Sequence, residues 1–176
     1  FFKTTLNCAS MTNLVILSHE KEYSFVEEIK QYLRSADSSI TVFNITDVQS
    51  DEEPILRITE EMNKSQVSII LISSNLMADD LLLSIRKLAI DLHDEDKLEA
   101  IQVLIRSVYD HSTESKRKIY TIPETPISHI KDRDTAYNEI IRFILDKAEL
   151  IMLKGKLELA NEKIKRLSAT IERLIS

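Results

Sequence analysis

Short apolar runs alternate with longer amphipathic stretches along this chain. The strongest run, residues 67–72, is rich in β-branched side chains and is bounded by serines. A run of this length is too short for a buried helix and is typical of a strand covered on both faces. It therefore predicts the central strand of a parallel sheet, with Ser73 and Ser74 at its carboxyl end.

Four further apolar runs predict strands in the same way, and the stretches between them have helical periodicity. The predicted strands are residues 14–17, 40–43, 101–105 and 119–122, and the helical stripes lie within residues 25–33, 55–62 and 82–92. Strands that alternate with helices pair in parallel through right-handed crossovers. We therefore expect an α/β fold with a flavodoxin-like five-stranded parallel sheet, in the order 2-1-3-4-5, with helices on both faces.

The ends of these elements have their own signals. Ser24, with Glu27 three residues later, forms a capping-box sequence for the first helix, and Pro54 suits the first turn of the second. Residues 44–53 are expected to form a long acidic loop, and residues 93–96 a solvated turn.

The last helix is predicted to begin at Asp132 or Asp134 and to continue to the end of the chain. Its apolar residues follow strict heptad spacing: Leu150, Leu153, Leu157, Ala160, Ile164, Leu167, Ile171 and Leu174. Ile164 and Ile171 with Leu167 and Leu174 form the pattern that favours parallel dimers. We expect residues 147–176 to form a coiled coil that joins two chains. The alternative is a long helix that folds back onto its own domain.

This helix would follow a domain at residues 11–146, with residues 1–10 as a tag or a disordered extension. The charge of −6 argues against nucleic acid as a partner, and no apolar stretch is long enough to span a bilayer. Cys8 is the one cysteine, which fits the reducing cytoplasm. Gly155 is the one glycine, which excludes glycine-rich phosphate loops. The four histidines lack metal-ligand spacing, so no metal site is expected. No cofactor is expected either.

Three segments of the chain together resemble the TIR (Toll/interleukin-1 receptor) family, in its bacterial or TIR-like branch. Residues 15–19 followed by 25–27 are similar to the first box of the family. Ser65 followed by residues 67–74 resembles a second family segment, and residues 126–128 followed by 133–137 resemble the stretch before the last helix. The resemblance covers about residues 14–144. It implies a signalling or defence module that works by self-association and contacts between TIR domains.

The resemblance also implies a pocket where many family members hydrolyse NAD. Its residues here would be His19, Glu20, Phe43, Ser73 and Ser74. Active members carry a glutamate on the helix after the third strand, but that position falls at or near Ile85 in this chain. We therefore expect a module that does not cleave NAD. Two alternatives stay open: an NAD glycohydrolase that uses a displaced carboxylate, with Glu20 as the weak candidate, or a nucleotide sensor that binds without cleaving.

Overall fold

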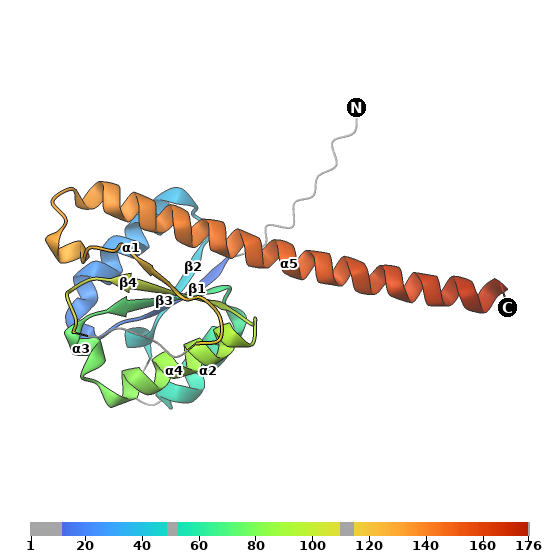
Figure 1. The fold of residues 1–176 in the computed structure, drawn as a ribbon, viewed down its shortest axis with the longest axis horizontal. Coiled ribbons are helices and arrows are strands. Elements are labelled where there is room, and N and C mark those ends of the chain that lie inside the picture. The colour runs from blue at the N-terminus through green and yellow to red at the C-terminus, as the bar shows by residue number, and fades with distance from the viewer. Residues whose placement is uncertain (1–11, 49–52, 110–114, 176) are drawn as a thin grey trace.

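The computed structural model describes residues 12–48, 53–109 and 115–175, and its core is one parallel sheet (Figure 1). The strands are β1 (Asn13–Leu17), β2 (Thr41–Asn44), β3 (Val67–Ile72), β4 (Glu99–Leu104) and β5 (Tyr120–Ile122). Their order is β2-β1-β3-β4-β5, which confirms the predicted flavodoxin-like topology. Every residue of the central strand β3 is buried, as its apolar run predicted. The predicted extension at residues 1–10, with Cys8, lies outside the described residues.

Helices cover both faces of this sheet and complete two apolar cores. On one face lie α1 (Tyr23–Ala36) and α5 (Arg133–Ile175), and on the other lie α2 (Pro54–Lys64), the short α3 (Ser74–Met77) and α4 (Asp80–Asp94). Successive side chains of a strand point to opposite faces. In β1, Leu14 and Ile16 accordingly join the core under α1 and α5, while Val15 and Leu17 join the core under α2 and α4.

The structure departs from two local predictions. The first helix begins at Tyr23 after a 3-10 turn (Glu20–Glu22), so Ser24 lies inside the helix and does not cap it. The predicted solvated turn at residues 93–96 is wrong in its first half, because α4 continues through Asp94 and His93 is buried. The imidazole Nδ1 of His93 accepts a hydrogen bond of 3.2 Å from the backbone N–H of Ala100, which holds the ring inside the core.

The loop after β2 contains a short 3-10 helix (Ile45–Asp47). The backbone N–H of Asn44 donates to the carboxylate of Asp47 at 3.1 Å, and this closes the turn. Residues 49–52 of the predicted acidic loop lie outside the described residues.

Helix α5 has two parts with different surroundings. Its first part packs on the sheet and α1 through Tyr137, Ile140, Ile141, Ile144 and Ala148. From Leu153 to Leu174 every residue is exposed, and the helix projects away from the domain in one piece (Figure 1). The alternative in which this helix folds back onto its own domain is therefore wrong.

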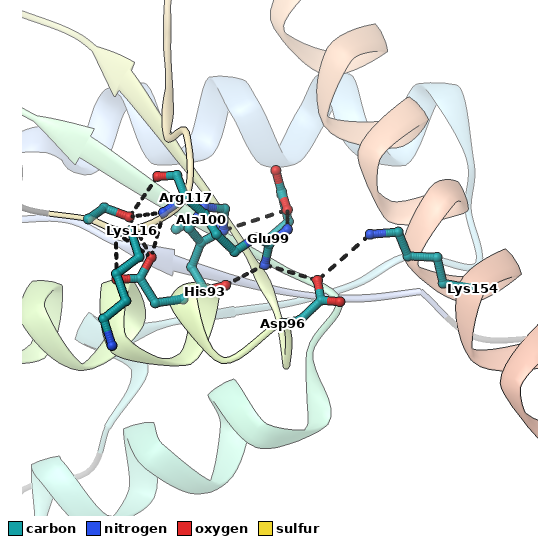
Figure 2. Close-up of polar contacts among 9 residues, drawn as sticks. His93, Asp96, Glu99, Ala100, Lys116, Arg117 and Lys154 are labelled. Atoms are coloured by element: carbon teal, nitrogen blue, oxygen red, sulfur yellow. Dashed lines mark hydrogen bonds and ion pairs between the residues drawn. The ribbon is translucent and has the colours of Figure 1, made fainter.

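A cluster of charged side chains joins the parts of the chain near the amino ends of β4 and β5 (Figure 2). The guanidinium of Arg117 contacts the backbone oxygen of His93, the Asp96 carboxylate at 3.0 Å and the Glu99 carboxylate at 3.3 Å. The ammonium of Lys154 lies 3.7 Å from Asp96. This last contact ties α5 to the domain at the point where the helix leaves it.

Asp94 fixes the segment that leads into β5. Its carboxylate accepts hydrogen bonds from the backbone N–H groups of Lys116 and Arg117, both at 3.0 Å, and from the Ser115 hydroxyl at 2.6 Å. These bonds, led by the one from Lys116, stabilise the ionised form and lower the pKa of Asp94 to about 2. The segment is therefore held to the end of α4 by a carboxylate that stays charged through the neutral range.

Candidate functional site

The carboxyl ends of the strands border a cavity of about 560 Å³. Its wall comes from the loop after β1, the loop after β2 and the start of α4: Ser18, His19, Glu20, Ile45, Thr46, Val48, Pro54, Asp79, Leu81 and Leu82. Parallel α/β sheets bind ligands at this edge, where the strand order reverses. In this sheet the reversal lies between β1 and β3, so the cavity occupies the position that the topology predicts.

Hydrogen bonds join the two loops that line one side of this cavity. The buried hydroxyl of Ser18 donates to the side-chain oxygen of Asn44 at 3.2 Å, and the Asn44 amide donates to the Thr46 hydroxyl at 2.6 Å. These contacts join the carboxyl end of β1 to that of β2. The two loops are therefore held in fixed positions on one side of the cavity.

Two of the predicted pocket residues line the cavity. His19 is half-buried, and its Nδ1 accepts a hydrogen bond of 3.1 Å from the backbone N–H of Lys21. This bond caps the 3-10 turn and orients the ring. Glu20 is exposed at the rim. The site thus has the oriented imidazole of His19 and the solvent-exposed carboxylate of Glu20. Both side chains can bind a polar ligand.

The structure places the other three predicted residues away from this cavity. Phe43 packs against the core under α2, with the Arg57 guanidinium 5.7 Å from its ring centroid. Ser73 is buried, and its hydroxyl accepts from the backbone N–H of Leu76, which caps α3. Ser74 lines a second depression of about 380 Å³ with Met77, Ala78, Ser107, Val108 and Tyr109.

The start of α4 supplies one carboxylate to the cavity wall. Asp79 accepts a hydrogen bond of 3.0 Å from the backbone N–H of Leu82, so it caps the helix. Six residues further along, Ile85 is only 1% exposed and belongs to the core under α2 and α4. The position at which the sequence resemblance led us to look for a glutamate therefore carries a packed aliphatic side chain.

Sequence reasoning missed Glu22, whose carboxylate is fully buried beside the carboxyl ends of β3 and β4. It accepts hydrogen bonds from the Asn75 side-chain amide at 2.8 Å and from Nε of Arg106 at 3.3 Å. The signal was present, since Glu22 precedes the buried Phe25 and Val26 by three and four residues and shares their helical face. The run of charges at residues 20–22 concealed it.

The projecting part of α5 forms a second candidate site. We call its heptad positions the seam: Leu150, Leu153, Leu157, Ala160, Ile164, Leu167, Ile171 and Leu174. The large seam side chains are between 47% and 81% exposed. A row of exposed apolar side chains of this length is typical of an interaction surface.

No helix within the described residues has an apolar segment long enough to cross a bilayer. No group of three or more His, Cys, Asp and Glu side chains within residues 12–48, 53–109 and 115–175 is arranged to hold a metal ion.

Comparisons with known proteins identify which known fold this chain resembles. No protein-family model and no curated protein matches this chain. Among solved structures, the TIR domain of the Toll-related receptor TRR-2 from the lower metazoan Hydra magnipapillata is similar, with a TM-score of 0.55 and 12% identity. The match covers 74% of this chain and 96% of that domain. A conserved protein from Enterococcus faecalis V583 matches 56% of this chain and 66% of its own, with 14% identity and a TM-score of 0.43. The similarity to the receptor TIR domain shows that this chain has a TIR-like fold.

Proposed function

We propose that this chain is a cytoplasmic TIR-like signalling or defence module that self-associates through its C-terminal helix. The observation that carries the proposal is the exposed seam, which has the residue types and spacing of a two-stranded coiled coil. Joining two chains raises the local concentration of their domains, so that weak contacts between TIR-like domains become populated. The similarity in fold to a receptor TIR domain supports such contacts.

We further propose that the module does not cleave NAD. Cleavage of the bond between ribose and nicotinamide develops positive charge, which a correctly placed carboxylate stabilises. Ile85 lies in the core at the expected position, and Asp79 is engaged in capping α4. The cavity at the carboxyl edge supports a second candidate function, the binding of a nucleotide such as NAD, because His19 and Glu20 line it.

Light scattering after size-exclusion chromatography tests the self-association. We expect the wild-type chain to have the mass of a dimer and the double variant Leu157→Asp/Ile164→Asp to have that of a monomer. The matched control is Leu159→Asp/Arg166→Asp, which places two aspartates at the same spacing on the same helix but off the seam. A wild-type monomer, or an unchanged mass in the seam variant, would contradict the proposal.

A further inference from the structure

Helix α5 presents two apolar faces that point in opposite directions. The first face packs into the domain through Tyr137, Ile140, Ile141, Ile144 and Ala148. The second is the seam, which starts at Leu150. An α-helix turns by about 100° per residue. On that rotation the mean directions of the two sets differ by roughly 180°. The seam therefore points away from the domain to which its own helix is attached.

The helix has no break that would change this relation. It is one helix from Arg133 to Ile175, and all three prolines of the chain lie before it. Gly155 keeps an ordinary helical conformation, and apart from its chain neighbours and the backbone of its own helix no heavy atom lies within 4 Å of its position for a Cβ. Kinks arise mainly at prolines, bulges or inserted side chains. The direction of the seam relative to the domain is thus fixed by a continuous helix.

The seam also has a defined beginning. Asp146 lies seven residues before Leu153, so it occupies the same heptad position one repeat earlier, and it is exposed. Two aspartates facing each other at this position would repel, so close pairing begins at Leu150. Close pairing therefore starts two residues after Ala148, where the helix leaves the core.

The charges beside the seam favour pairing with α5 of a second copy of this chain, in parallel orientation. With Leu150 at heptad position a, Glu149 occupies position g, and Lys154 occupies the following position e. The Lys154 ammonium, which lies 3.7 Å from Asp96 of its own domain, would in a parallel pair lie between that carboxylate and Glu149 of the other copy. In a parallel pair each Glu149 meets Lys154 of the other copy, on both sides of the seam. In an antiparallel pair with full overlap, Lys163 of one chain would face Lys163 of the other chain near the middle of the seam. Parallel pairing thus gains two attractions and avoids one repulsion.

We propose that two copies form a parallel two-stranded stem that holds their TIR-like domains back to back. This inference rests on the proposed self-association and adds its geometry. Each domain lies on the outer side of its own helix, because the seam and the packed face are opposite. The cavity wall that includes the start of α4, together with α2, lies on the side of the sheet away from α5. Contacts through these surfaces then form between separate dimers, so the stem makes each dimer a divalent unit of a larger assembly.

Disulfide trapping tests the orientation. In a Cys8→Ser background, Leu174→Cys places one thiol at the last position of the seam. A parallel stem brings the two thiols together, and we expect a covalent dimer on a non-reducing gel after mild oxidation. In a fully overlapping antiparallel pair the two thiols at position 174 lie about 36 Å apart and cannot form a disulfide. Position 174 of one chain would then face position 150 of the other, so a cross-link would form only when the Leu174→Cys chain is mixed with a Leu150→Cys chain. Cross-linking of the mixture alone would overturn the inference.

Distances between identical spin labels test the back-to-back arrangement. A label at Asp146→Cys lies near the stem axis, where helices are about 8–10 Å apart, and we expect a separation within about 20 Å. A label at Lys87→Cys lies on the exposed side of α4, which is on the far side of the domain from α5. Because the domain is about 30 Å across, we expect the two labels to be more than about 40 Å apart. A short distance at position 87 with a long one at position 146 would overturn the proposal.

Masses of the same labelled samples separate the two proposals. A monomeric mass would remove both the self-association and the geometry that rests on it. A dimeric mass with contrary cross-links or distances would remove the parallel, back-to-back geometry and leave the self-association standing.

Discussion

The buried carboxylate of Glu22 accepts a hydrogen bond of 2.8 Å from the side-chain amide of Asn75. The two residues are 53 positions apart in the sequence. Glu22 ends the turn that follows β1, and Asn75 belongs to α3, which follows β3. Because β1 and β3 are neighbours in the sheet, the bond fixes the two connections that flank the point where the strand order reverses.

Removing this carboxylate is expected to destabilise the domain. Glu22→Ala leaves the half-buried Asn75 amide without its acceptor and Arg106, whose side chain is 50% exposed, without its ion pair. An unsatisfied buried polar group costs about 1–3 kcal/mol. We expect the free energy of unfolding in urea to fall by about 2 kcal/mol.

The matched control for Glu22 is the neighbouring exposed glutamate. Glu20→Ala should change the free energy of unfolding by less than about 0.5 kcal/mol, as most surface substitutions do. Equal effects of the two variants would contradict the structural role of Glu22.

His93 is expected to make stability depend on pH. Burial lowers the pKa of its imidazole, although the Glu99 carboxylate, 3.6 Å away, acts in the opposite direction. The unfolded chain therefore binds a proton below pH about 6.5, while the folded chain binds it only at lower pH. The contribution of neutral His93 to the free energy of unfolding is therefore complete above about pH 6.5, and it is lost as the pH falls below that value.

The substitution His93→Gln tests this dependence. The variant should be less stable than the wild type at pH 7, because the ring fills the core and accepts from Ala100. The difference in free energy of unfolding should shrink between pH 7 and 5. A constant difference across this range would show that His93 does not titrate as expected.

The purified chain is expected not to consume NAD, even at concentrations that favour assembly. The reason is the core position of Ile85 on α4. Among the described residues, the cavity wall at the start of α4 then has a single carboxylate, that of Asp79, which caps this helix. Chromatographic measurement of nicotinamide release checks this result. Turnover that disappears in Glu20→Ala would instead establish the displaced carboxylate.

Titration with NAD in a calorimeter separates binding from cleavage. Heat of binding without nicotinamide release would identify a sensor, and its loss in His19→Ala would place the ligand in the cavity. Lys87→Ala, on the exposed side of α4, is the control and should bind as the wild type does.

Reversing one charge beside the seam is expected to weaken the dimer. Glu149→Lys turns both interhelical attractions with Lys154 into repulsions. Exposed ion pairs contribute about 0.2–1 kcal/mol each, so two reversals should raise the dissociation constant about tenfold. Sedimentation at several concentrations measures the change. Glu158→Lys, away from the seam, should leave the constant near the wild-type value.

A mixed dimer gives the rescue experiment. Lys154→Glu should weaken its own homodimer in the same way. When this chain is mixed with the Glu149→Lys chain, both interhelical pairs again have opposite charges, and the mixed dimer should associate about as tightly as the wild type. Equal association of all combinations would contradict the parallel pairing.

The sequence by itself determined the order of the strands and the seam of α5. Both follow from local, repeated patterns: apolar runs joined by crossovers of one hand, and apolar residues at heptad spacing. Strand β3 and the long helix α5 accordingly lie where residues 67–72 and the heptads predicted them. Such patterns need no knowledge of distant contacts.

Only the tertiary structure decided which charged and polar residues are inside. Glu22 and Glu20 belong to the same charged run, yet one is buried and the other exposed. Glu22 is satisfied by Asn75 and by Arg106, which is 84 positions away. Burial of a charge depends on partners that the crossovers bring together, so no local pattern reveals it. The same holds for the separation of His19 and Glu20, at the cavity, from Phe43, Ser73 and Ser74, which lie elsewhere. It also holds for the direction of the seam, because only packing decides which face of α5 the domain covers.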